Sequence, residues 1–395
     1  MPPYRASLSW LSPTRRRLMA PTAPSHAPTA AHASPHAAPK LASIEAARAL
    51  AALAVVLMHT THLMRVPQFT GHVALGGAFD FGYVGVDFFF VLSGFIITFV
   101  HHAELGRGAA RWPGYLWKRF VRVFPIYWMV LAMTAGPSIL SRLLAGRTPV
   151  SELDSDDIPG TLLLWIGAKE PEYVGVAWSL QYEVMFYLSF CVLLLHLRGG
   201  LALYGLWAAL VVAQTFGALP GTLPWKLGDP HCLQFLMGVA TGLLARRATL
   251  PLVRWQGWMV GAVFVAAVLY ERLGPQGAHA FGGRVALGLA SALVLATLVA
   301  MERRHAVRVP AALAQLGAVS YSLYLAHCLL INIVLALLAK AGVYRALPEV
   351  VTFAIAVVAA VSGGWLIGRW LELPVVAWLR RITAPRASAV PAVTG

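Results

Sequence analysis

Charged side chains are scarce in this chain of 395 residues. Asp, Glu, Lys and Arg together make up 12% of the sequence, whereas hydrophobic residues make up 58% and the mean hydropathy is +0.69. Soluble globular proteins carry about a quarter charged residues. This shortage of charge excludes an ordinary soluble domain and predicts a chain that crosses a membrane several times.

Acidic residues and cysteines are also few. The 16 acidic residues against 31 Lys and Arg give a formal net charge of +15. The basic residues lie between apolar runs instead of forming one patch, so we interpret them as determinants of membrane topology and expect no nucleic-acid partner. Cys191, Cys232 and Cys328 all lie inside apolar runs. We therefore expect neither a disulfide framework nor a thiol–metal site, and no metal.

Long apolar runs make up most of the remaining sequence. Windows long enough to cross about 30 Å of hydrocarbon occur at 42–64, 81–101, 123–144, 174–197, 200–218, 229–245, 255–271, 282–301, 312–339 and 347–371. They predict an all-α, polytopic integral membrane protein with about ten transmembrane helices in one bundle. One side of these helices carries more than twice as many Lys and Arg residues as the other. We therefore expect both termini on the cytoplasmic face of the cytoplasmic (inner) membrane.

The chain divides into a transmembrane domain and two tails. Residues 1–40 are rich in Pro, Ala, Ser, Thr and His, which predicts a disordered cytoplasmic tail. His26, His32 and His36 are compatible with weak metal binding there, although we favour a low-complexity tail. The transmembrane domain is expected at 41–381 and a cytoplasmic C-terminal tail at 382–395. This leaves no room for a soluble catalytic domain, so any chemistry takes place in the bundle or at its faces.

The run from Ile44 to His62, IEAARALAALAVVLMHTTH, contains Glu45, Arg48 and His59. Ionisable groups inside a bilayer are costly and usually have a partner or a function. Arg48 and His59 are separated by three helical turns plus about 20°, so both project from one helix face, about 16 Å apart along the axis. One face therefore joins an arginine near a membrane surface to a histidine well inside. Glu45, one turn before Arg48, is expected to neutralise it.

Other ionisable residues fall at depths similar to that of His59. Asp87 and Glu183 belong to the outer half of their predicted helices, and Tyr324 and His327 lie three residues apart on one helix face. Together they predict a polar cavity. A carboxylate beside a histidine fixes its tautomer and stabilises the imidazolium, so His59 with Asp87 or Glu183 is suited to act as a general base. The alternative for each residue is an interhelical hydrogen bond that locks the bundle.

The inner side of the third predicted helix is basic. Arg119 and Arg122 lie about one turn apart beside Lys118. Arginine side chains present forked donors that suit phosphate oxygens. The alternative is that these residues only set the orientation of the helix in the membrane.

Six segments, in this order, resemble the membrane-bound acyltransferase family 3, whose members O-acylate cell-surface glycans. They are IEAARALAALAVVLMHT at 44–60, GVDFFFVLSGFII at 85–97, KRFVRVFPIYW at 118–128, WSLQYEVMFYL at 178–188, LGAVSYSLYLAH at 316–327 and ELP at 372–374. The form of the fourth segment is more similar to the exopolysaccharide and nodulation-factor branch than to the lipopolysaccharide branch.

This resemblance implies transfer of an acyl group, usually acetyl from cytoplasmic acetyl-CoA, to a hydroxyl of an extracytoplasmic or lipid-linked glycan. It implies that Arg48 and His59 are a functional pair and that Arg119 and Arg122 form a second basic motif. The arginines would then hold the coenzyme phosphates, and His59 would meet the thioester. Direct transfer with His59 as general base and transfer through an acyl-histidine both fit, and we prefer the first.

The expected partners are acetyl-CoA as a substrate, with no permanently bound cofactor, a glycan or lipid-linked sugar acceptor, and membrane lipids. Candidate substrate-binding residues are Trp178, Ser179, Tyr324 and His327, and Tyr324 or Trp178 is the candidate donor to the thioester oxyanion. Two alternatives remain. The first is a transporter of a glycan, lipid-linked sugar or anionic solute. The second is a non-catalytic partner of a polysaccharide synthase. The sequence lacks the internal repeats that many transporters have.

Overall fold

The computed structural model describes residues 41–145, 158–167, 173–219, 221, 223–224, 226–247, 254–273 and 280–383, which all belong to one unit of the chain. Within these residues the regular structure is entirely helical, as the sequence predicts. The predicted tails at 1–40 and 382–395 lie outside the described residues, except for the last two residues described, 382 and 383.

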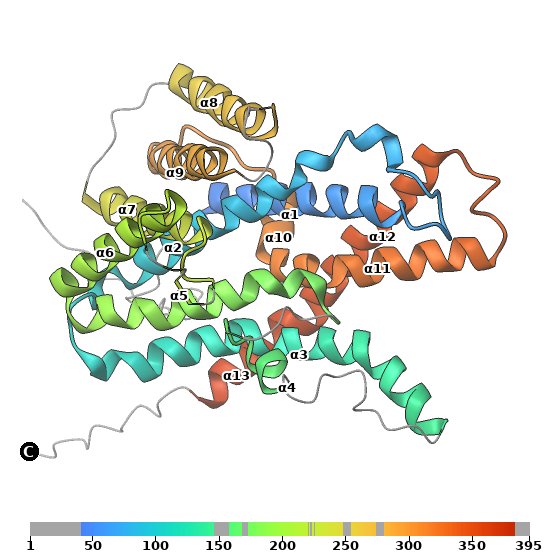
Figure 1. Cartoon of the computed structure of the whole chain (residues 1–395), viewed down its shortest axis with the longest axis horizontal. Helices are drawn as coiled ribbons and strands as arrows, with labels where there is room; N and C mark the ends of the chain where they lie inside the picture. The colour runs from blue at the N-terminus through green and yellow to red at the C-terminus, as the bar shows by residue number, and fades with distance from the viewer. Residues whose placement is uncertain are drawn as a thin grey trace, which may run out of the picture. The chain divides into compact units, whose positions relative to one another are not determined.

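Figure 1 shows the helices in chain order by colour. They are α1 (Ala42–Leu63), α2 (Val84–His101), α3 (Trp112–Leu144), α4 (Ile158–Leu163), α5 (Trp178–Leu195), α6 (Leu197–Thr215), α7 (His231–Arg247), α8 (Arg254–Leu273), α9 (Phe281–Arg303), α10 (Ala311–Ala318), α11 (Ser320–Lys340), α12 (Glu349–Ile367) and α13 (Leu373–Ile382). A π-helical turn, Gly368–Glu372, joins α12 to α13.

Most of these helices match a transmembrane helix in length and composition. Among the described residues, 8 helical segments are long and apolar enough to cross a membrane, and α7 forms a shorter apolar helix. With α8, which occupies the predicted window 255–271, this agrees with the expected number of about ten. The chain is therefore a multi-pass membrane protein.

Two helices differ from their predicted windows. Helix α3 begins at Trp112, not near residue 123, and continues through Pro125 and Pro137. A proline removes one backbone hydrogen bond but does not have to end a helix whose neighbours supply packing. Arg119 and Arg122 consequently lie inside α3, three residues apart on one face. The window 312–339 is divided into α10 and α11 at Val319.

Helix α2 is the central helix, with 72% of its apolar window buried. It packs against α1, α5, α7 and α9. Gly94 of α2 and Gly238 of α7 permit the close approach of these two helices. A methyl group added at Gly94 would lie 2.1 Å from the carbonyl oxygen of Phe235, and one added at Gly238 would lie 1.9 Å from the carbonyl oxygen of Val91. Small residues commonly permit such approaches in membrane proteins. This packing fixes α2 with one face toward α7 and α9.

Candidate functional site

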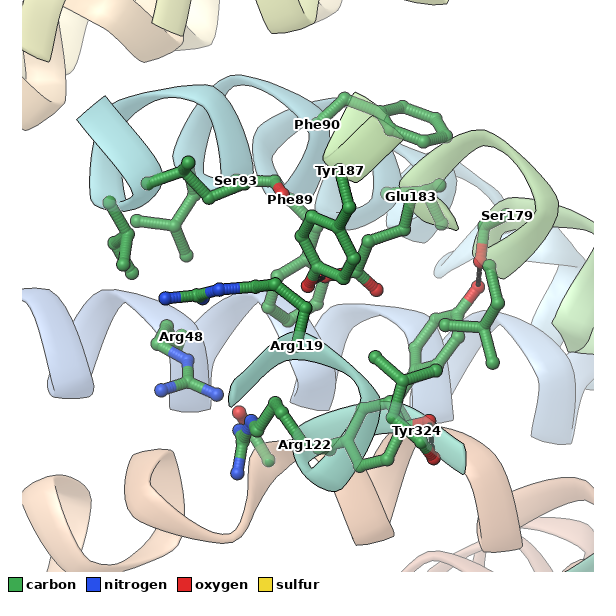
Figure 2. A pocket seen from close by; sticks show the side chains of 18 residues that line it. Arg48, Phe89, Phe90, Ser93, Arg119, Arg122, Ser179, Glu183, Tyr187 and Tyr324 are labelled. Carbon is green, nitrogen blue, oxygen red and sulfur yellow. Dashed lines mark hydrogen bonds between the residues drawn. The ribbon is translucent and has the colours of Figure 1, made fainter. Parts of the chain in front are cut away.

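A cavity of about 160 Å³ lies among α1, α2, α3, α5 and α11. Arg48, Arg119 and Arg122 line one end of it, and Ser179 and Tyr324 line the other (Figure 2). The walls between them are largely apolar and come mainly from α2 and α5, including Phe89, Phe90 and Leu180. Segments far apart in the sequence therefore form one space with a basic end.

The three arginines have different partners. Arg48 Nη1 donates to Glu45 at 3.1 Å, which is the neutralising contact predicted from their spacing. Arg122 forms an ion pair with Glu372, whose carboxylate is fully buried. Glu372 also accepts a hydrogen bond from the Ser322 hydroxyl at 2.7 Å. Arg48 and Arg122 are thus each held by a carboxylate.

Arg119 has no such carboxylate contact among the described residues. Its Nη2 donates to Nε2 of His101 at 3.0 Å, and its guanidinium lies 5.7 Å from the ring centroids of both Tyr115 and Tyr187. Its Nε is buried and has no hydrogen-bond partner within the described part of the chain. A buried donor without a partner is costly, so this group is suited to bind an anion that enters the cavity.

Glu183 and Tyr187 lie one turn apart on α5, between the two ends of the cavity (Figure 2). The Tyr187 hydroxyl donates to the Glu183 carboxylate. At the end remote from the arginines, the hydroxyls of Ser179 and Tyr324 lie 2.8 Å apart, and both are within hydrogen-bond distance of the carbonyl oxygen of Val176. The cavity therefore ends at a pair of hydroxyl groups.

His59 and His327 form a pair next to this end, although neither lines the cavity itself. Nδ1 of His59 lies 3.1 Å from Nε2 of His327, and the two ring centroids are 4.8 Å apart. The ring of His327 also lies 6.0 Å from that of Tyr324. The pair joins α1 to α11 and is one helical turn beyond Tyr324.

The neighbours of the two rings define their tautomers when both are neutral. Nδ1 of His59 lies 3.0 Å from the carbonyl oxygen of Val55, and Nδ1 of His327 lies 2.6 Å from that of Tyr324. A carbonyl oxygen only accepts, so each Nδ1 carries the hydrogen. His327 Nε2 is then an acceptor for His59 Nδ1–H, which leaves Nε2 of His59 with a lone pair. His59 thus has the form of a base whose orientation is fixed by two acceptors.

Asp87 of α2 and Trp178, the first residue of α5, have other neighbours. In the structure Asp87 is not hydrogen-bonded to His59: it accepts from Gln234 at 2.6 Å and from Arg284 at 3.1 Å. Trp178 packs against the ring of His231 at 5.5 Å and is not among the residues that line the cavity. Glu183 shares the cavity with the arginines and has no hydrogen bond to His59 in the structure. Depth in the membrane therefore did not identify the partner of His59.

A second polar cluster, which the sequence did not reveal, surrounds His231 at the start of α7. His231 contacts Arg284, and its Nδ1 lies 2.7 Å from Asp229. The hydroxyl of Tyr182 also donates to Asp229. The sequence order Asp229-Pro230-His231 before an apolar run was the available signal.

Comparisons with known proteins identify the family of this chain. A family model described as an acyltransferase domain matches residues 41–369. The chain belongs to the acyltransferase 3 family. The exopolysaccharide production protein ExoZ of Rhizobium meliloti is 28% identical over 342 residues, which cover 83% of this chain and 97% of that protein. The acyltransferase MdmB of Streptomyces mycarofaciens is 26% identical over 326 residues, which cover 74% and 79%. No solved structure matches the chain.

Membership of the acyltransferase 3 family fixes the general activity. The chain is a membrane acyltransferase, and its reaction needs an acyl donor and an acceptor. The cavity and the histidine pair both lie within the matched residues.

Proposed function

We propose that this acyltransferase moves an acetyl group from cytoplasmic acetyl-CoA to a hydroxyl of an extracytoplasmic or lipid-linked polysaccharide or oligosaccharide. The observation that carries this proposal is one cavity with three guanidinium groups at its first end and a histidine pair just beyond its second end. The proposal includes a cytoplasmic-membrane location with both termini in the cytoplasm. Acetyl-CoA is a substrate in this scheme, and no resident cofactor is required.

The arginine end suits the phosphates of the coenzyme. Arg119 has an unsatisfied buried Nε–H, and Arg48 and Arg122 add positive charge that fixed carboxylates hold in place. Forked donors of this kind bind phosphate oxygens well. The pantetheine arm then extends past Glu183 and Tyr187, so that the thioester lies near Tyr324.

In the reaction, Nε2 of His59 takes the proton of the acceptor hydroxyl as its oxygen attacks the thioester carbonyl. His327 and the carbonyl of Val55 stabilise the resulting imidazolium. The carbon–sulfur bond then breaks, and the proton passes from His59 to the coenzyme thiolate. Tyr324, whose hydroxyl ends the cavity, is our candidate donor to the oxyanion. Attack by His59 itself, giving an acyl-histidine, is the alternative route.

The acceptor class is supported by a relative. The name of the Rhizobium meliloti protein refers to exopolysaccharide production, and this chain matches nearly its whole length. A surface or lipid-linked polysaccharide is therefore our proposed acceptor. We expect the surface glycan of a deletion strain to lack one acetyl modification, as measured by mass spectrometry, and the intact gene to restore it.

The test of the reaction uses purified protein in detergent, labelled acetyl-CoA and the glycan from the deletion strain. Wild type is expected to transfer label, and His59→Ala is expected to lose transfer while it still binds coenzyme. His62→Ala is the matched control, because His62 lies on the same helix but is exposed and paired with Asp80. Normal turnover of His59→Ala would remove His59 from the reaction. Glycan movement across proteoliposomes without acetyl-CoA would instead support a transporter.

A further inference from the structure

The histidine pair has a third neighbour that the proposed reaction does not use. The sulfur of Cys328 lies 3.4 Å from Nε2 of His327, the same atom that lies 3.1 Å from Nδ1 of His59. Each of these three residues offers one ligand atom, and the three atoms all lie within 4.8 Å of one another. Two hydrogen donors, a thiol and an imidazole N–H, thus converge on one lone pair.

We propose that His59, His327 and Cys328 form a binding site for one Zn²⁺ ion, and that the bound ion switches off the acyltransferase. From the sequence, Cys328 was expected to be an apolar packing residue and no metal site was predicted. The metal site itself follows from the geometry of the three side chains. Only its effect on catalysis depends on the proposed role of His59.

The spacing of the ligand atoms fits zinc. Bonds of about 2.0–2.1 Å to nitrogen and about 2.3 Å to sulfur place neighbouring ligand atoms about 3.3–3.6 Å apart in a tetrahedron. The two separations of 3.1 and 3.4 Å are close to these values. The third pair of ligand atoms, on His59 and Cys328, lies within 4.8 Å and closes by up to about 1.2 Å when an ion binds. Imidazole and thiolate ligands favour Zn²⁺ over Mg²⁺ and Ca²⁺, which prefer oxygen. A fourth position remains for water.

The surroundings also support a metal ligand role for His327. Its Nδ1–H donates to the carbonyl oxygen of Tyr324, an arrangement that orients the ring and presents Nε2. His327 is buried, whereas His59 and Cys328 are each only half-buried. Asn332 is exposed one turn beyond Cys328 and donates to the Cys328 carbonyl oxygen at 2.9 Å.

Zinc binding changes the tautomer of His59. The thiol of Cys328 loses its proton, which is released to solvent, and the sulfur and Nε2 of His327 bind the ion. When Nδ1 of His59 also binds, its hydrogen moves to Nε2 and the hydrogen bond to Val55 is lost. Nε2 of His59 then carries a hydrogen and cannot accept the proton of an acceptor hydroxyl. Zinc therefore removes the general base without entering the coenzyme cavity.

The binding experiment uses full-length protein in detergent, purified without a histidine tag. His26, His32 and His36 are replaced by Ala throughout, so that the tail cannot supply ligands. Co²⁺ is titrated while the thiolate-to-cobalt charge-transfer absorption is followed, and Zn²⁺ is then added as competitor, with Mg²⁺ as a negative control. We expect one saturable site per chain from which Zn²⁺ displaces Co²⁺.

Cys328→Ser is the decisive variant, and Cys191→Ser is the matched control, because Cys191 is buried in the core of α5 and is not part of the three-residue cluster. Loss of even an outer partner of a metal ligand lowers metal affinity about 10- to 100-fold, so loss of the thiolate is expected to lower Zn²⁺ affinity at least about tenfold and to abolish the absorption band. Cys328→Ala gives a second variant that adds no hydroxyl. Absence of the band in wild type, or equal zinc affinity in wild type and both Cys328 variants, would overturn the site.

The inhibition experiment measures acetyl transfer against Zn²⁺ concentration in the same proteins. Wild type and Cys191→Ser are expected to lose transfer and to recover it with EDTA. Cys328→Ser is expected to keep its basal rate and to need at least about tenfold more Zn²⁺ for half inhibition. Zinc binding without this difference refutes the switch. If acetyl-CoA supports no transfer in any protein, the proposed function fails while the cobalt spectrum still tests the site.

Discussion

Replacement of Arg119 by Ala is expected to weaken binding of the acyl donor without unfolding the protein. Arg119 lines the basic end of the cavity and has a buried Nε–H without a partner in the described residues. Its neighbours are His101 and two tyrosine rings, so its removal leaves no buried carboxylate without a countercharge. This distinguishes it from Arg122, which is paired with the fully buried Glu372.

The size of the effect follows from the contact that is lost. A hydrogen bond to a charged group contributes about 1.5–3 kcal/mol, and each 1.4 kcal/mol is a factor of about ten. The Kd for coenzyme A and the KM for acetyl-CoA should therefore both rise about 10- to 150-fold. Arg119→Lys retains the charge but loses the fork, so it is expected to give an intermediate value.

The assay combines two measurements on purified protein. Calorimetric titration with coenzyme A gives the Kd, and initial rates at saturating acceptor give the KM. Arg111→Ala is the matched control, because Arg111 is exposed just before α3 and does not line the cavity. An unchanged Kd and KM in Arg119→Ala, at normal thermal stability, would refute the placement of the phosphates at this end.

Three further predictions concern the neighbouring groups. Arg122→Gln should lower the free energy of unfolding by about 3–5 kcal/mol in denaturation assays, because it leaves Glu372 buried and unpaired. Adding Glu372→Gln should restore much of the lost stability, and equal stability of the single and double variants would contradict this explanation. His327→Leu should lower kcat about tenfold or more at unchanged donor KM, because His327 orients the base His59. His327→Gln should partly restore kcat, and a change in KM alone would exclude the orienting role. The hydrogen bond to Glu349 raises the pKa of His72, so this bond stabilises the fold at about pH 5, and the stabilisation is lost as pH rises through the raised pKa. The Tm difference between wild type and His72→Gln should therefore shrink toward about pH 8. A pH-independent Tm difference would refute this role of the hydrogen bond.

Helix positions could be predicted from this sequence because apolar runs of membrane length are long and uninterrupted. The contact of Glu45 with Arg48 was also predictable, since it depends only on helical spacing. The start of α3 at Trp112 was not, because Lys118, Arg119 and Arg122 interrupt the apolar pattern and Pro125 resembles a helix boundary. Tertiary packing keeps this segment helical despite both signals.

The partners of the polar residues were harder to predict than the helices. Depth along a helix follows from residue number, but the neighbour that a face meets depends on how the helices are arranged around one another. Asp87 and His59 share a depth, yet α2 turns Asp87 toward Arg284 while Phe89 and Phe90 face the cavity. The contact between His59 and His327 depends on α1 lying beside α11, which no local pattern encodes.

In the proposed mechanism, one cavity holds the acyl donor with its phosphates at the arginine end and its thioester near the histidine pair. A cryo-EM structure with a non-hydrolysable acetyl-CoA analogue tests this most directly. We expect phosphate oxygens within hydrogen-bond distance of Arg119 and the acyl end beside Tyr324, on the side of His59. An analogue bound outside this cavity, or with its acyl end at the arginines, would contradict the account.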